Sequence, residues 1–146
     1  MSYNQALSAY RETRVKTASQ GSLIVMLYDE AIKQLRTAVA YIENDCKKNP
    51  ALIEKINDCV LKAQEVITEL MASLDMEAGG EISRNLLALY SYFNQELLAG
   101  NVNKDGTKLA FVCDMMDQLR MAWAEAANSQ AAPRSTAAPA GVNIAG

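Results

Sequence analysis

Leu74-Asp-Met-Glu-Ala-Gly-Gly-Glu-Ile82 is the stretch that separates two long runs of apolar residues at helical spacing. Its two glycines, Gly79 and Gly80, tolerate positive φ and allow the chain to turn sharply there. Because the connection is only a few residues long, the helices on either side are expected to pack antiparallel. The earlier helix presents Leu52, Ile56, Val60, Ala63, Ile67, Leu70 and Leu74, and the later one Ile82, Leu86, Leu89, Tyr90, Phe93 and Leu97.

Residue types that cap helices mark the ends of four long helices. Asn49 followed by Pro50 predicts the start of the second helix, and Asp105 predicts the start of the fourth. Ser19 is expected to cap the first helix, and Gly100 lies where the third is expected to end.

The sequence therefore predicts an all-α fold, an antiparallel four-helix bundle with a short N-terminal capping helix over residues 3–17. The helical domain is expected to span residues 1–128. Residues 129–146 are rich in Ala, Pro and Ser and have almost no large side chains. Such a tail buries too little apolar surface to offset its ordering entropy, so we expect it to be disordered.

Composition argues against a nucleic-acid partner and against export by the general secretory route. A chain of 146 residues with a formal net charge of −3 has no basic field to hold a polyanion. The N-terminus has neither the cationic start nor the apolar stretch of a signal peptide. The longest apolar run, residues 23–28, is far too short to cross a bilayer. We therefore expect a cytoplasmic protein.

The three cysteines do not form a metal or redox motif. Cys46, Cys59 and Cys113 are widely spaced and include no CxxC pair. Cys59 and Cys113 fall on apolar faces of predicted helices, where free cysteine packs as a small hydrophobe. Both are expected to be buried and inert, in a reducing compartment.

The residues that catalysis most often uses are missing. The chain has no histidine and no glycine-rich phosphate loop, which excludes His-based acid or nucleophile chemistry and nucleotide cradles. The carboxylates are spaced like solvated helix faces, and Asp117 with Arg120 is expected to be a surface pair. We predict no enzyme activity, no metal and no cofactor. An all-carboxylate metal enzyme is the remaining catalytic alternative.

Some apolar residues lie beside the stripes that fill the core. Leu23, Val25 and Met26 widen the apolar arc of the first helix, and Leu87, Tyr92 and Leu98 widen that of the third. Such residues are either sandwiched between neighbouring helices or line a groove for a partner, and methionine suits adaptable grooves. In the N-terminal stretch Leu7 and Tyr10 share one side, which predicts that this stretch docks on the bundle.

Short motifs recur in a fixed order between residue 3 and residue 127. They comprise Tyr10, Val15, Thr17-Ala-Ser19, Leu23 to Asp29, Ala31-Ile32, Leu74-Asp75, Glu77, Gly79 to Ile82, Asn85-Leu86, Leu89-Tyr90, Tyr92, Leu119-Arg120 and Ala122-Trp123. In this order and spacing they resemble the FliS family of flagellar secretion chaperones. Two differences stand out: Gln20 occupies a position where the family often has proline, and Glu30 one where it often has glycine.

The resemblance implies a cytoplasmic, ATP-independent chaperone for flagellin. Its expected client is the C-terminal segment of flagellin, which it would keep from premature polymerisation and deliver for type III flagellar export. Components of the export gate are further candidate partners, and a homodimer is left open. The alternative is a regulatory adaptor that binds an anti-sigma factor or another flagellar protein. The predicted partner-binding residues are Leu7, Tyr10, Leu23, Met26, Leu27, Asp29, Leu87 and Tyr92.

Overall fold

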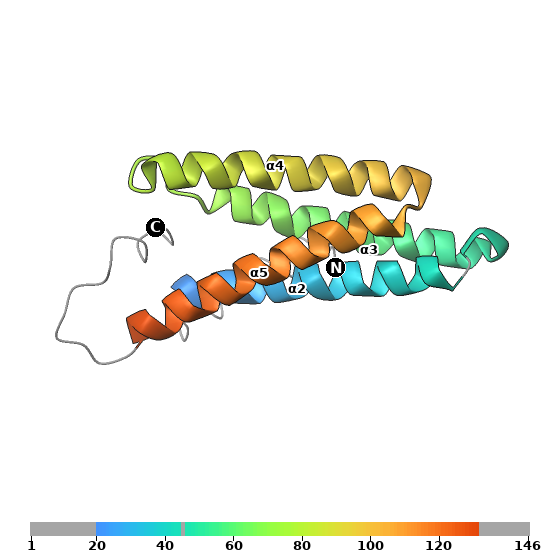
Figure 1. Cartoon of the computed structure of the whole chain (residues 1–146), viewed down its shortest axis with the longest axis horizontal. Helices are drawn as coiled ribbons and strands as arrows, with labels where there is room; N and C mark the ends of the chain where they lie inside the picture. Colours follow the sequence, from blue (N-terminus) through green and yellow to red (C-terminus); the bar gives the residue numbers. More distant parts are fainter. Residues whose placement is uncertain (1–19, 45, 132–146) are drawn as a thin grey trace, which may run out of the picture.

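Four long helices and one short 3-10 turn make up the computed structural model, which describes residues 20–44 and 46–131. The helices are α2 (Gln20–Glu43), α3 (Pro50–Ala72), α4 (Gly80–Asn103) and α5 (Gly106–Ala131), and the turn η1 (Cys46–Lys48) joins α2 to α3. They form an elongated bundle (Figure 1) in which α2 and α4 each pack against α3 and α5. The predicted all-α four-helix bundle is confirmed, and the predicted N-terminal helix lies outside the described residues.

Local capping chemistry explains where α3 and α5 begin. The Asn49 side chain accepts a hydrogen bond from the Ala51 N–H (3.1 Å), and Pro50 occupies the first helical position. The Asp105 carboxylate accepts from the Thr107 N–H (3.0 Å) in the same way. Both predicted caps are confirmed, whereas Ser19 lies outside the described residues.

The connection between α3 and α4 is built around Asp75. The Asp75 carboxylate accepts from the backbone N–H groups of Glu77 (3.1 Å) and Ala78 (2.9 Å). Its carbonyl oxygen accepts from the Gly79 N–H (2.8 Å) and from the hydroxyl of the fully buried Ser83 (2.9 Å). Gly80 takes φ +53, which explains the second glycine of the motif.

The predicted end of the third helix near Gly100 is wrong, because α4 continues to Asn103. Gly100 is buried, and a Cβ there would lie 3.0 Å from the Leu109 side chain, so it allows the start of α5 to approach α4. The turn comes instead at Lys104, which adopts the left-handed conformation (φ 51, ψ 46). Its ammonium group donates to the Asn57 side chain and to the Asn101 carbonyl oxygen, each at 2.8 Å, and so ties α3 to the end of α4.

The bundle ends differ from the predicted boundaries by a few residues. The first helix, α2, ends at Glu43, and α5 runs to Ala131, past the predicted domain boundary at residue 128. The remaining residues of the predicted tail, 132–146, lie outside the described part of the chain. None of the described helices combines the length and hydrophobicity needed to cross a bilayer.

Aromatic residues from three helices meet in the core. Tyr28 of α2 and Tyr90 of α4 are buried, and their hydroxyl groups share a hydrogen bond across the bundle. The Tyr90 and Phe93 rings pack with centroids 6.5 Å apart, and Trp123 of α5 is also buried. Burial of large rings from separate helices fixes how those helices sit relative to one another.

High pH is expected to weaken the fold through this tyrosine pair. Burial raises the pKa of Tyr28 and of Tyr90 above the value of about 10 for a tyrosine in an unfolded chain. Above about pH 10 the native state holds protons that the unfolded chain releases, so the stability present below that pH decreases as pH rises. Urea unfolding at increasing pH measures this decrease, which should be smaller in a Tyr28→Phe, Tyr90→Phe double variant. An equal decrease in both proteins would contradict the assignment.

Candidate partner-binding surface

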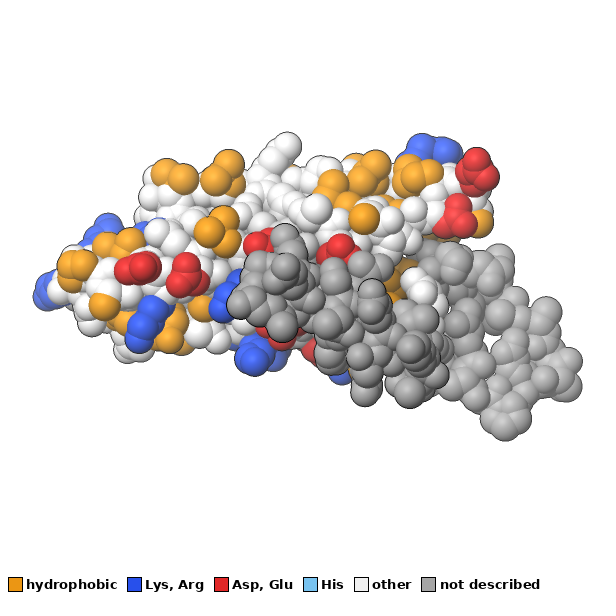
Figure 2. Space-filling model, turned by 180° about the vertical axis from the view of Figure 1, so that it is seen from behind, with side chains coloured by type: hydrophobic (Ala, Val, Ile, Leu, Met, Phe, Trp, Pro, Cys, Tyr) orange, Lys and Arg blue, Asp and Glu red, His pale blue; other side chains and the backbone are white. Residues whose placement is uncertain are grey.

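The outward face of α4 carries a strip of exposed residues at helical spacing. Tyr92, Leu98 and Val102 are 44%, 58% and 72% exposed, fractions that are unusual for large apolar side chains. Gln95 is exposed between Tyr92 and Leu98, and Ala88 is exposed one turn before Tyr92. We call Ala88, Tyr92, Gln95, Leu98 and Val102 the α4 strip. In Figure 2, which shows the bundle from behind, α4 lies along the upper edge. Hydrophobic side chains recur along this edge, and charged side chains gather at its right-hand end.

The α4 strip contains no charge. Between Arg84 and Lys104 the sequence has a single charged residue, Glu96. The Glu96 carboxylate is half-buried and lies 3.4 Å from the Lys108 ammonium group, so its negative charge is paired with a positive one within the protein. A surface helix normally places charged residues on its outer face, and an uncharged apolar face indicates a contact surface.

Neighbouring helices widen the α4 strip on both sides. Phe111 of α5 is 44% exposed and meets the Tyr92 ring edge to face, with centroids 6.4 Å apart. On the other side, Gln64 of α3 donates to the Asn94 carbonyl oxygen (3.2 Å). Leu61 is exposed one turn before Gln64. The apolar surface therefore extends from α4 onto both of its neighbours.

A shallow groove of about 400 Å³ runs along α3 and adds polar groups to this side of the bundle. Its lining includes Leu61, Gln64 and Glu65. Within the described part of the chain, Glu65 Oε2 and Asn94 Oδ1 are buried without a hydrogen-bond partner. A buried acceptor without a donor costs about 1–3 kcal/mol, so these two oxygen atoms lower the stability of the bundle.

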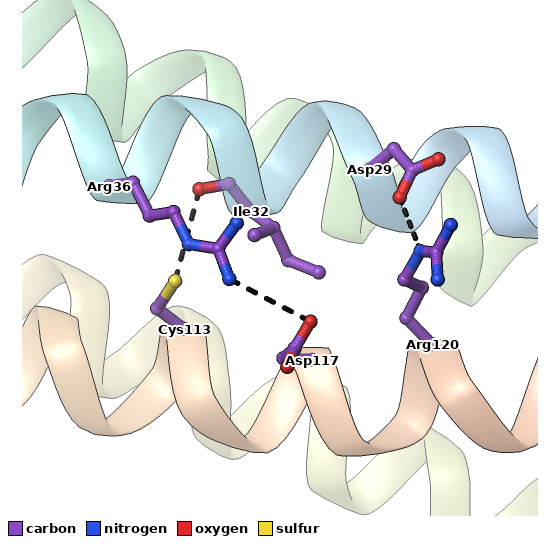
Figure 3. A network of polar contacts seen from close by, with 6 residues as sticks. All are labelled: Asp29, Ile32, Arg36, Cys113, Asp117 and Arg120. Carbon is purple, nitrogen blue, oxygen red and sulfur yellow. Dashed lines mark hydrogen bonds and ion pairs between the residues drawn. The ribbon is translucent and has the colours of Figure 1, made fainter.

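Ion pairs close the opposite side of the bundle, between α2 and α5. Arg120 donates to the Asp29 carboxylate, and Arg36 lies 3.8 Å from the Asp117 carboxylate (Figure 3). The hydrogen bond to Asp29 also raises the pKa of Arg120. The attraction of Asp117, predicted along the same helix, adds to this raised pKa, and both residues also pair across the α2–α5 seam.

Across residues 20–44 and 46–131 no three side chains of the metal-ligating types gather at one place. Cys59 and Cys113 are buried free thiols, as predicted, and burial raises the pKa of both. Cys113 lies in the α2–α5 seam, where its thiol is 3.8 Å from the Ile32 carbonyl oxygen.

Comparison with known proteins matches residues 3–130 to a family described as flagellar protein FliS. The chain belongs to the FliS family. It is 33% identical to the flagellar secretion chaperone FliS of Bacillus subtilis over 130 residues, which cover 89% of this chain and 92% of that protein. It is 34% identical to the flagellar secretion chaperone FliS of Salmonella typhimurium over 114 residues, covering 77% and 79% of the two chains.

Membership of the FliS family settles the class of protein. The family consists of chaperones of flagellar secretion, so the prediction that this chain is not an enzyme is confirmed by its relatives. The predicted resemblance, the helical bundle and the role in flagellar secretion agree with the same relatives.

The predicted partner-binding residues do not all lie on one surface of this FliS-family bundle. Leu23 and Leu27 are 3% and 2% exposed, so the structure places both inside the bundle. Met26 and Leu87 are half-buried on α2 and α4, and Asp29 is exposed and bonded to Arg120. Tyr92 lies on the α4 strip, whereas Leu7 and Tyr10 lie outside the described residues. The binding role of all eight stays a prediction.

Sequence reasoning missed part of the exposed apolar surface. Leu98 was recognised as a residue beside the core stripe, but Leu61, Val102 and Phe111 were not. The signal that could have found the strip is the near absence of charge between Arg84 and Lys104.

Proposed function

We propose that this chain is a cytoplasmic chaperone that binds the disordered C-terminal segment of flagellin. In this role it prevents premature polymerisation and assists type III flagellar export. The observation that carries the proposal is the uncharged α4 strip on the surface of a FliS-family bundle. A strip of that composition suits a partner whose contact face is also apolar.

Physical chemistry supports a disordered client of this kind. A segment that folds as it binds must offset an ordering cost of about 2–5 kcal/mol or more, and it does so by burying about 1,000–3,000 Å². An amphipathic helix satisfies this requirement when its apolar face lies in a hydrophobic groove on a rigid scaffold. The α4 strip and its neighbours Phe111 and Leu61 offer such a surface on rigid helices.

The remaining predicted contacts fit this proposal in different ways. Leu87 lies on α4 with the strip, and the half-buried Met26 offers an adaptable side chain on α2. Leu7 and Tyr10 are proposed to contribute from the N-terminal stretch. Leu23 and Leu27 are buried, so we propose that they act by holding α2 in place rather than by direct contact.

Substituting Leu98 with lysine should weaken binding of a flagellin C-terminal fragment by about tenfold or more, because it places a charge in an apolar contact. Isothermal titration calorimetry measures the dissociation constant of the fragment for the native chain and for the Leu98→Lys variant. Leu98 is 58% exposed, so the substitution should leave the urea midpoint nearly unchanged.

The matched control is Met121→Lys, at a residue of α5 that is similarly exposed (55%) and lies outside the α4 strip. This control should change the affinity by less than about twofold. Equal affinities of the two variants would contradict the placement of the client on α4. No binding of the fragment by the native chain would contradict the proposed function itself.

A further inference from the structure

The shallow groove on α3, about 400 Å³ in volume, contains a buried acceptor that the described part of the protein leaves without a donor. This α3 groove is lined by Leu61, Gln64, Glu65, Thr68 and Glu69. Glu65 Oε2 is buried, and no described group donates a hydrogen bond to it. We propose that the α3 groove receives a lysine or arginine side chain of the flagellin client, with the Glu65 carboxylate as its acceptor. This inference rests on the proposed function and names a feature that the client must carry.

The polar groups that accompany Glu65 in the α3 groove donate elsewhere. The Gln64 side-chain amide donates to the Asn94 carbonyl oxygen (3.2 Å), and the Thr68 hydroxyl donates to the Gln64 carbonyl oxygen (2.9 Å). Asn94 itself adds a second buried acceptor without a donor, its Oδ1 atom. The group that completes the groove is therefore a hydrogen-bond donor brought by a partner.

The charge around the α3 groove favours a cation over a neutral donor. Two carboxylates, those of Glu65 and Glu69, line it. Residues 63–83 include no lysine or arginine, and their acidic residues are Glu65, Glu69, Asp75, Glu77 and Glu81. Glu65 belongs to none of the ion pairs among the described residues. A cationic donor forms the stronger, charge-assisted hydrogen bond with such a carboxylate.

Leu61 gives the α3 groove an apolar edge that suits a long cationic side chain. Leu61 is 54% exposed and lies one turn before Glu65 on α3. Lysine and arginine pack their methylene stems along apolar surfaces while their charged ends reach polar groups. A client side chain can therefore lay its stem against Leu61 and carry its charged end to Glu65.

The α3 groove lies beside the α4 strip, so one client helix can contact both. α3 and α4 run side by side in Figure 1, and the bond from Gln64 to Asn94 joins them. An amphipathic helix carries its polar side chains beside its apolar face. With that face on the α4 strip, a lysine or arginine at its border reaches over α3. The α3 groove thus adds selection for charge to a strip that has no charge of its own.

Glu65→Gln tests the proposal because stability and affinity should not fall together. Functional sites often hold groups that lower the stability of the free protein. Glutamine has the size of glutamate but no charge, so the urea midpoint of the variant should equal or exceed that of the native chain. Its affinity for the flagellin C-terminal fragment, measured by calorimetry, should fall about tenfold, because the cation loses a charged acceptor.

A matched control and a set of client variants make the test specific. Glu54→Gln removes an exposed carboxylate from the same helix, ~16 Å from Glu65 along α3, and should change the affinity by less than about twofold. Flagellin fragments with each lysine or arginine replaced in turn by methionine identify the client residue. One replacement should weaken binding to the native chain about tenfold but have little further effect on Glu65→Gln, because both changes remove the same contact.

The outcomes separate this inference from the proposed function. Equal affinities of the native chain and Glu65→Gln, or no client residue whose effect depends on Glu65, would overturn the inference and leave the chaperone function standing. A urea midpoint that falls along with the affinity in Glu65→Gln would assign Glu65 to the fold and also overturn the inference. No binding of the fragment by the native chain would overturn the proposed function, and this inference with it.

Discussion

Replacing Gly79 with alanine should lower the free energy of unfolding by about 2–3 kcal/mol. A Cβ at this position would lie 1.7 Å from the Ser83 hydroxyl oxygen and 2.8 Å from the Asp75 carbonyl oxygen. The Ser83 hydroxyl would have to leave its hydrogen bond to Asp75, and Ser83 is fully buried, so the displaced hydroxyl has no access to water. Urea unfolding followed by circular dichroism measures the loss.

The adjacent glycine provides the control. Gly80 has φ +53, but a Cβ there would meet nothing within 4 Å, so Gly80→Ala should cost only the backbone strain of about 1–2 kcal/mol. In a Ser83→Gly background, Gly79→Ala should lower the free energy of unfolding by less. The Ser83 side chain is then gone, and only the clash with the Asp75 carbonyl oxygen is left. A larger loss for Gly80→Ala than for Gly79→Ala would contradict the geometry of this turn.

Features set by local chemistry could be predicted from the sequence. Helix caps are an example. The side chains of Asn49 and Asp105 each accept a hydrogen bond from a backbone N–H two positions later, so a short stretch of sequence is enough to recognise them. Gly100 shows the limit of that reasoning. A glycine near a helix end resembles a terminator, but here it lies within the helix, where a Cβ would crowd the Leu109 side chain of the next helix.

The binding surface was only partly predictable for the same physical reason. Helical spacing identifies which residues share a face, but exposure depends on where neighbouring helices lie, and so Leu23 is buried while Leu98 is exposed. The hydrogen bond between Asp29 and Arg120 joins residues 91 positions apart, so no local sequence pattern predicts it. Tyr92 was predicted, but its partner Phe111 belongs to another helix and was not.

Replacing Tyr90 with alanine should destabilise the protein by about 3–5 kcal/mol, the range for removing a buried aromatic ring. Tyr90 is 1% exposed and contacts the rings of Tyr28 and Phe93, so its loss leaves a cavity between α2 and α4. It also removes the hydrogen-bond partner of the buried Tyr28 hydroxyl. The free energy of unfolding from urea titration measures the effect.

Tyr90→Phe separates the ring from its hydroxyl group and keeps the test informative if the alanine variant does not fold. It should cost about 1–3 kcal/mol, because the buried Tyr28 hydroxyl loses this partner while the ring stays in place. In a double-mutant cycle with Tyr28→Phe the two losses should not add, because each substitution breaks the same bond. Reduced affinity for the flagellin fragment with unchanged stability in Tyr90→Ala would place Tyr90 on the binding surface and contradict its role in the core.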